Sequence, residues 1–325
     1  MNSRSAWILV SSVLFAGCRI DAQARPAGGP QSGAANPSVR LAVNMTTVES
    51  APVFLAARES PTLRIDLTGG GIPLLFDGAA DLATNSETQA LLRSIANPNL
   101  RIILTVAECY YRLVARRSAG IQRVSDLRGK RVGTPSSTSA HYYLAKMLRT
   151  AKLSEADVIV VPLPVPDMAS AIKKGDVDAV SSWEPGAQNA VDALGRDGVV
   201  LQDRSVYREL FNLNATTDAL GDPAKRRAIV DTVRAIVRAS AQVNARPKEV
   251  WPLVGSQINV AVPTIATVWR HFRFPAALPG DTLDVLTEEE QWVAALQKRA
   301  PRGRQALQSL IDDSVLRDAR TALSR

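Results

Sequence analysis

The 325-residue sequence contains few of the side chains on which most metal and redox sites depend. It has two cysteines, Cys18 and Cys109, and two histidines, His141 and His271, which lie far apart in the chain. Two cysteines cannot build a disulfide framework, and no Cys/His or His/carboxylate spacing here is typical of a metal site. The HEXXH, GXSXG, P-loop and GXGXXG signatures are also missing. The sequence therefore predicts no bound metal and no cofactor.

Long basic runs and aromatic clusters are missing as well. Aromatic residues make up 5% of the chain, and acidic and basic side chains are interspersed, with a net charge of +8. Nucleic acid is therefore not an expected partner, although the positive balance weakly favours anionic partners. Hydrophobic residues make up 46% of the chain, and its length is sufficient for two domains with proper cores.

The N-terminus has the pattern of an export signal. Arg4 is followed by an apolar run over residues 6–16, which is too short to span a bilayer but has the length of a signal-peptide core. The run ends in L-F-A-G-C, which resembles a bacterial lipobox in which the cysteine, here Cys18, becomes lipidated. We therefore expect a signal peptide over residues 1–17; secretion with an unmodified Cys18 is the alternative. Residues 18–38 are rich in Pro, Gly, Ala and Ser and predict a flexible tether to a membrane.

From residue 39 onward, short apolar segments alternate with helical ones, which predicts an α/β fold with mainly parallel sheets. The expected strands cover residues 39–45, 63–67, 80–83, 100–107, 111–115, 130–133, 158–161, 177–181, 199–202 and 210–216. Beyond Pro223 the chain is expected to be almost wholly helical. The helices expected there cover residues 225–244, 247–254, 263–272, 287–300 and 305–323.

One stretch, residues 131–151, predicts a strand, a tight turn and then a helix. Four hydroxyl residues stand at the start of that helix: Ser136, Ser137, Thr138 and Ser139. Hydroxyl side chains are favoured there because they accept hydrogen bonds from the free amide groups of the first turn. A helix N-terminus can also hold an anion through its amides and its dipole. The residues alone leave two interpretations open, simple helix capping and an anion-binding site.

Four segments resemble one family, the substrate-binding proteins of ABC importers for nitrate, sulfonates and taurine, also described as NMT1/THI5-like. They are D-L-R-G-K-R-V-G at 126–133, T-V-E-S-A-P-V-F-L-A-A at 47–57, A-D-L-A-T-N-S-E-T at 80–88 and G-D-V-D-A-V-S-S-W-E-P at 175–185. The resemblance implies a two-lobed type II periplasmic-binding-protein fold with a helical C-terminal portion. Lobe 1 would comprise residues 39–115 and 212–325, and lobe 2 residues 116–211, with crossovers near 111–116 and 210–216. Residues 58–62 and 71–81 are shorter than the corresponding family segments.

The resemblance also implies a ligand site between the lobes, because ligands of open α/β sheets bind beyond the carboxyl ends of strands. The hydroxyls and amides of Ser137, Thr138 and Ser139 would hold an anionic group of the ligand. Trp183 would supply an apolar wall, or pack in the core, and Glu184 would bind a ligand amine, or stabilise a helix N-terminus. The expected ligand-binding residues are Thr47, Glu49, Ser86, Glu87, Ser136, Ser137, Thr138, Ser139, Trp183, Glu184 and Asn212.

The function that the resemblance implies is solute capture without chemistry. A monomeric, lipid-anchored protein outside the cytoplasm, periplasmic or at the cell surface, would deliver a small anionic or zwitterionic solute to an ABC permease and its ATPase. Two alternatives stay open. One is an enzyme of the same fold, such as a lyase, a desulfinase or a pyrimidine-precursor synthase, for which Cys109 is the only cysteine after the signal. The other is the ligand-sensing component of a signalling system.

Overall fold

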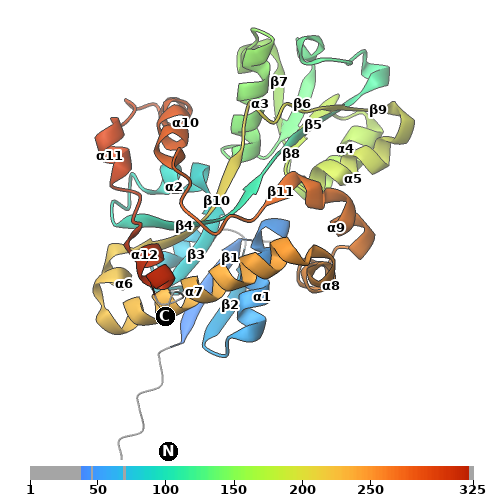
Figure 1. The fold of residues 1–325 in the computed structure, drawn as a ribbon. Helices are drawn as coiled ribbons and strands as arrows, with labels where there is room; N and C mark the ends of the chain where they lie inside the picture. The colour runs from blue at the N-terminus through green and yellow to red at the C-terminus, as the bar shows by residue number, and fades with distance from the viewer. Residues whose placement is uncertain (1–37, 45–46, 69–70, 322–325) are drawn as a thin grey trace, which may run out of the picture. The chain divides into compact units, whose positions relative to one another are not determined.

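The computed structural model describes residues 38–44, 47–68 and 71–321. The expected signal peptide, Cys18 and the tether up to residue 37 lie outside these residues. Within them, no helix has the length and apolar character needed to cross a membrane. Figure 1 shows the chain as a ribbon, with the helices and strands labelled.

A six-stranded sheet has the order β11-β4-β10-β3-β1-β2. Its strands are β1 (Val39–Asn44), β2 (Leu63–Thr68), β3 (Leu82–Ser86), β4 (Leu100–Cys109), β10 (Glu209–Thr216) and β11 (Phe272–Arg273). The sheet is mixed rather than mainly parallel, since β1 runs parallel to β2 and β3 whereas β10 runs antiparallel to both β3 and β4. The near-continuous apolar run of β4 is buried except at Arg101. Such a run is typical of a buried parallel strand, but both neighbours of β4, β10 and β11, run antiparallel to it.

A second, five-stranded sheet has the order β7-β6-β8-β5-β9. It contains β5 (Arg112–Arg116), β6 (Arg131–Thr134), β7 (Ile159–Pro162), β8 (Ala179–Ser182) and β9 (Gly198–Leu201). Here β6 runs parallel to β7 and β8, and β5 runs antiparallel to β8 and β9.

The chain passes between the two sheets twice, through residues 110–111 and 202–208. Both passages come before the limits expected from the sequence. The whole of β5 pairs within the five-stranded sheet, although residues 112–115 were expected in lobe 1. Likewise, β10 pairs within the six-stranded sheet from Glu209 onward, although lobe 2 was expected to reach residue 211. An apolar alternation marks a strand but not the sheet that it joins, which explains the difference.

The helices surround both sheets. They are α1 (Ala51–Glu59), α2 (Glu87–Arg93), α3 (Ser139–Thr150), α4 (Val165–Lys174), α5 (Gly186–Leu194), α6 (Thr217–Gly221), α7 (Pro223–Ala245), α8 (Pro247–Ile258), α9 (Val262–Val268), α10 (Thr282–Leu296), α11 (Arg304–Gln308) and α12 (Ser314–Thr321). Short 3₁₀ helices are η1 (Val48–Ser50), η2 (Ile72–Leu75), η3 (Arg117–Ala119), η4 (Val124–Leu127), η5 (Glu155–Asp157), η6 (Gly195–Asp197) and η7 (Trp269–His271).

The longest helix, α7, packs against α1 and α12 (Figure 1). Its start is capped by Asp222, whose Oδ1 accepts hydrogen bonds from the amides of Ala224 and Lys225 at 2.8 and 3.0 Å. Pro223 stands in the first turn, where its missing N–H costs nothing. The expected helix over 225–244 is thus confirmed and extended by these local signals.

Two expectations for the C-terminal region were wrong. Phe272 was expected in a helix but pairs with Cys109 as part of β11. The helix expected over 305–323 is divided into α11 and α12, because the chain between them bonds to β4: Ile102 donates its amide to Leu310 and accepts from Asp312 at 2.7 and 3.0 Å. The Asp312 side chain then accepts from the amide of Ser314 at 2.9 Å, at the start of α12.

Candidate ligand-binding site

Three buried side chains meet where η1, β4 and β10 come together. Glu49 lies in η1, directly after β1, while Cys109 ends β4 and pairs in register with Glu209, the first residue of β10. One oxygen of each carboxyl and the Cys109 sulfur all lie within 4.8 Å of one another. Oε2 of Glu49 and Oε2 of Glu209 are buried and have no hydrogen-bond partner among the described residues. We refer to Glu49 and Glu209 as the carboxyl pair.

Burial governs the protonation of the carboxyl pair. It raises the pKa of Glu49 to about 7, against the hydrogen bonds of its own backbone and of the Cys109 and Thr47 side chains, and the charge of Glu184 adds to the rise. The pKa of Glu209 is also raised, by burial and then by the charges of Glu49 and Glu87. Among the described residues, no Lys or Arg forms an ion pair with either carboxyl. The pair therefore favours its protonated form in the ligand-free protein.

Tyr111 connects the carboxyl pair to the start of α3. It lies on the first passage between the sheets, and its hydroxyl shares a hydrogen bond of 2.8 Å with Oγ of Ser139. The same hydroxyl lies close enough to Glu209 to lower the pKa of that carboxyl, against the larger effect of burial. Around the Tyr111 ring, Trp183, Tyr143 and Tyr207 have ring centroids 6.2, 6.0 and 5.6 Å away. Trp183 is half-buried, so it lies beside Tyr111 without being sealed in the core.

The hydroxyl residues before α3 do not cap the helix in the expected way. Thr138 is the N-cap residue, but its hydroxyl donates a hydrogen bond to the carbonyl of Pro135 at 2.7 Å. It accepts no hydrogen bond from a helix amide. Ser136 and Ser137 are exposed, and the φ of Ser137 is 57°, in the left-handed region. The amide of Ser137 donates to Nδ1 of His141 at 3.2 Å. The capping interpretation is therefore wrong for these side chains.

Glu184 is already engaged within the protein. Its Oε1 accepts from Nε of the buried Arg112 at 2.5 Å, and its Oε2 accepts from the amide of Gln188 at 3.0 Å, in the first turn of α5. Arg112 also donates to Oε1 of Gln188 at 3.0 Å. Nearby, burial and the positive charges of Arg112, Arg204 and Arg270 lower the pKa of His271 to about 3, so this histidine is neutral. This geometry matches the second role considered for Glu184, a carboxylate at a helix start.

Glu87 and Ser86 lie at the junction of β3 and α2. The Glu87 carboxyl accepts from the Tyr207 hydroxyl and from the amide of Leu210 at 2.9 Å, so it ties α2 to the beginning of β10. Burial raises the pKa of Glu87 to about 7. Thr88, one residue on, donates to the buried Glu289 of α10. Ser86 is buried opposite Phe211 of β10. These two residues lie beyond the strand expected over 80–83; in the structure Ser86 ends a strand and Glu87 begins a helix.

Asn212 lies within the six-stranded sheet, between β3 and β4. It is fully buried, and its Oδ1 accepts from the Thr105 hydroxyl at 2.8 Å. In register it stands opposite Asn85 of β3. The structure thus brings Thr47, Glu49, Ser139 and Trp183 around Cys109, Glu209 and Tyr111, whereas Asn212 is held by neighbours inside the sheet.

Sequence reasoning missed Glu209, Tyr111 and Arg112. A signal for Glu209 does exist, since a carboxylate at the head of the fully buried strand E-L-F-N-L-N-A-T is unusual unless it has a task. Tyr111 and Arg112 are found only from the topology, because their place between the two sheets depends on where β4 ends and β5 begins.

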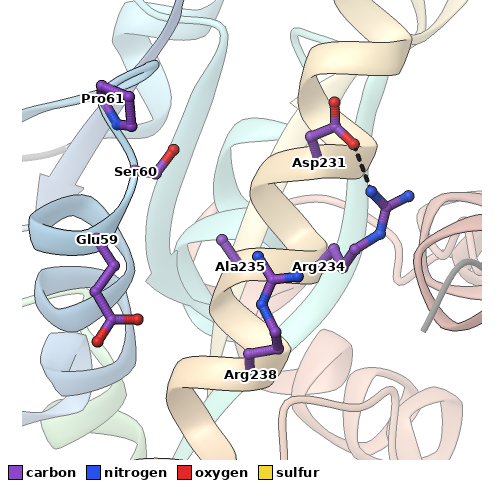
Figure 2. A pocket seen from close by; sticks show the side chains of 7 residues that line it. All are labelled: Glu59, Ser60, Pro61, Asp231, Arg234, Ala235 and Arg238. Carbon is purple, nitrogen blue, oxygen red and sulfur yellow. Dashed lines mark hydrogen bonds and ion pairs between the residues drawn. The ribbon is translucent and has the colours of Figure 1, made fainter.

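Two cavities lie elsewhere, along α7. The first, of about 220 Å³, is open between the end of α1 and α7 (Figure 2). It is lined by Glu59, Ser60, Pro61, Asp231, Arg234, Ala235 and Arg238. Figure 2 shows Arg234 turned toward Asp231, with which it forms an ion pair of 2.7 Å. A second cavity, of about 330 Å³, shares these two side chains. Neither cavity is lined by an expected site residue.

The chain is similar to curated proteins that are named for binding sulfonates. It is 36% identical over 83 residues to the taurine-binding periplasmic protein of Escherichia coli K12, covering 26% of this chain and 25% of the relative. It is 29% identical over 190 residues to a putative aliphatic sulfonates-binding protein of the same organism, covering 58% of this chain and 54% of the relative. The chain thus spans about a quarter and about half of the lengths of these two relatives.

Solved structures share the fold. The periplasmic aliphatic sulphonate binding protein SsuA from Escherichia coli has a TM-score of 0.71 at 17% identity, covering 84% of this chain and 92% of that one. The desulfurization enzyme DSZB has a TM-score of 0.61 at 16% identity, covering 88% and 99%. A Candida albicans gene product described as having the generic periplasmic-binding-protein fold has a TM-score of 0.63 at 16% identity, covering 85% and 96%. The predicted fold class is confirmed.

The family is shown by the sequence itself. Residues 68–250, more than half of the chain, match the model of the family described as NMT1/THI5 like. These residues contain β3, β4, all five strands of the second sheet and β10, and with them Cys109, Tyr111 and Glu209. The chain therefore belongs to the NMT1/THI5 like family, with the fold of the periplasmic binding proteins.

Proposed function

We propose that this protein is the solute-binding component of an ABC importer and captures a small anionic or zwitterionic solute of the sulfonate, taurine or nitrate kind. The observation that carries the proposal is the position of Tyr111. On one side its hydroxyl meets Ser139 at the start of α3, and on the other it faces Glu209 at the start of β10. Polar groups from both sheets therefore converge at the passage between them, where two-lobed proteins of this kind close on a ligand.

The start of α3 is the proposed anion subsite. The Thr138 hydroxyl donates to the carbonyl of Pro135 and accepts no hydrogen bond from the first-turn amides of α3. Those amides can therefore donate to an oxyanion. The exposed hydroxyls of Ser136 and Ser137 stand beside them. The Trp183 ring, half-buried beside Tyr111, would cover the apolar part of a solute.

The proposed partners are a permease and its ATPase, and the proposed location is outside the cytoplasm. The names of the two curated relatives, a taurine-binding periplasmic protein and an aliphatic sulfonates-binding protein, support both. A lipid anchor at Cys18, a monomeric state and two lobes that hinge at residues 110–111 and 202–208 complete the proposal.

Binding without catalysis agrees with the environment of Cys109. Its thiol is fully buried, and burial followed by the charges of Glu49 and Glu209 raises its pKa well above the usual range. A nucleophilic cysteine needs the opposite environment, which favours the thiolate. The likeness to the desulfurization enzyme is one of fold, and the negative charges of Glu49 and Glu209 disfavour the thiolate of Cys109.

A thermal-shift screen followed by calorimetry tests the proposal. The panel would contain nitrate, ethanesulfonate, propanesulfonate, taurine and their carboxylate analogues. A ligand at a hundredfold excess over its Kd stabilises the folded protein by about 2.7 kcal/mol, which raises its Tm measurably. If no small solute shifts the Tm or gives a binding isotherm, the proposed function is contradicted.

A further inference from the structure

Among the described residues, no Lys or Arg forms an ion pair with either member of the carboxyl pair. Glu49 and Glu209 are 2% and 3% exposed, and each keeps one oxygen without a hydrogen-bond partner in the described chain. The buried cation Arg112 is occupied by Glu184 and Gln188. An unpaired carboxylate in such a place is costly unless it is protonated or meets a cation. The protein supplies no cation among its described residues, which points to a ligand.

We infer that the carboxyl pair binds a primary ammonium group of the captured solute, so that the solute is a small zwitterion rather than a simple anion. This inference rests on the proposed solute-binding function. One oxygen of each carboxyl lies within 4.8 Å of the other, so a single ammonium nitrogen could donate hydrogen bonds of about 2.8 Å to both carboxyls. The free Oε2 atoms are the acceptors that such a group requires.

Tyr111 lies between the carboxyl pair and the start of α3, the proposed site for the anionic group of the zwitterion. One side chain separates the carboxyl pair from the α3 start, since the Tyr111 hydroxyl contacts Ser139 and affects Glu209. The positive and negative subsites are therefore only about one side chain apart, which suits a short amino-sulfonate. Burial raises the pKa of both carboxyls in the empty pair, and an arriving ammonium would favour their ionisation.

Glu184, which was considered for this role from the sequence, fits it less well. Both of its oxygens accept hydrogen bonds at 3.0 Å or less from Arg112 and Gln188, so its charge is already balanced. An amine would have to displace the guanidinium of Arg112. The carboxyl pair has no such internal competitor.

Matched probes test the inference by calorimetry on the purified protein: taurine against ethanesulfonate, and 3-aminopropanesulfonate against propanesulfonate. Within each pair only the amine differs. We expect the amino-sulfonate to bind roughly 10- to 100-fold more tightly, the range of a charge-assisted hydrogen-bonded contact. Glu209→Gln and Glu49→Gln should each reduce this preference toward one, while the affinity for the alkanesulfonate stays within a few-fold.

A matched control is Glu290→Gln. Glu290 is also a fully buried glutamate, but Arg299 and Arg302 pair with it at 2.5 and 2.9 Å. Its substitution should lower stability and leave the preference for the amine intact. A preference that survives in both Glu49→Gln and Glu209→Gln would overturn the inference.

The remaining outcomes separate this inference from the proposed function. Equal affinity for the two members of a pair, or binding of nitrate alone, overturns the ammonium site and leaves the solute-binding function standing. No binding of any solute contradicts both. Binding of Zn²⁺ to the solute-free protein that is lost in Cys109→Ser would show that the cluster is a metal site, and would also overturn the inference.

Discussion

The hydroxyl of Tyr111 and Oγ of Ser139 share a hydrogen bond of 2.8 Å, and with it the passage between the two sheets is joined to the start of α3. The two residues belong to different structural contexts, since Tyr111 follows the last residues of β4 and Ser139 opens a helix that follows β6. Both are buried. A solute bound by the α3 amides, as proposed above, would therefore also act on Tyr111, and through Tyr111 on the environment of Glu209.

The first prediction removes this hydroxyl. Tyr111→Phe keeps the ring and its contacts with Trp183 and Tyr207 but loses the bond to Ser139. We expect the affinity for taurine to fall about 10-fold, because one buried hydrogen-bonding group at the site is lost, and the free energy of unfolding to fall by about 1 kcal/mol. Isothermal calorimetry and urea denaturation measure the two effects.

Tyr142→Phe is the matched control for this substitution. Tyr142 is a buried tyrosine in α3 whose hydroxyl makes no hydrogen bond within the described part of the chain. Its removal should leave the affinity unchanged. If both substitutions weaken binding equally, the role of Tyr111 is one of packing only.

A second prediction concerns pH. The pKa of Glu49 is about 7 in the folded protein against an ordinary value of 4.5, so between these two values the folded state binds more protons than the unfolded state. The ligand-free protein should therefore lose stability as pH rises from about 4.5 to 7, by at most about 3 kcal/mol from this group. Glu87, whose pKa is also raised to about 7, should lower the stability over the same pH range. The titratable groups that face Glu49 are Glu209, Cys109 and Glu184.

Glu49→Gln isolates the contribution of this one group. Subtracting the pH profile of the variant from that of the parent, both measured by urea denaturation without solute, should leave a difference that grows from pH 4.5 to 7 and is constant above. A difference that is flat over this window would show that Glu49 has an ordinary pKa.

The main elements could be predicted from the sequence because their signals are local. The apolar run of β4, the Asp222–Pro223 start of α7 and the hydroxyl cluster before α3 each depend on neighbouring residues. The positions of these elements along the chain could therefore be predicted to within a few residues. The interruption between α11 and α12 was not, since it is caused by hydrogen bonds to Ile102, far away in the sequence.

The site was only partly predictable for the same reason. Glu49 was expected there, but its partner Glu209 is brought to it by the register in which β10 pairs with β4, and no local pattern encodes that register. Glu184 shows the converse. The sequence allowed two roles for it, and the distance to Arg112 decides between them.

The buried pair of Arg112 and Glu184 gives a third prediction. Arg112→Met leaves the Glu184 carboxylate unpaired in a buried place and should cost about 3–5 kcal/mol of unfolding free energy. Glu184→Gln should be costly as well. The double variant should lose less than the sum, since neither charge is then left alone, with a coupling of more than about 1 kcal/mol. Additive losses would mean that the two side chains stabilise the fold independently.

The last prediction returns to the hydroxyls before α3. In the double variant Ser137→Ala with Thr138→Ala, the only described hydrogen bond lost from a side chain is that of Thr138 to Pro135, so stability should fall by less than about 1 kcal/mol. Affinity for ethanesulfonate should fall about 10-fold if these groups assist the helix amides in holding the sulfonate.

Thr150→Ala is the control, because Thr150 makes the same kind of hydroxyl-to-carbonyl bond, 2.7 Å to Met147, at the opposite end of the same helix. That variant should lose similar stability and no affinity. Should the double variant lose stability and affinity in equal measure, the hydroxyls serve the local fold, and the anion subsite must be sought elsewhere along the passage between the sheets.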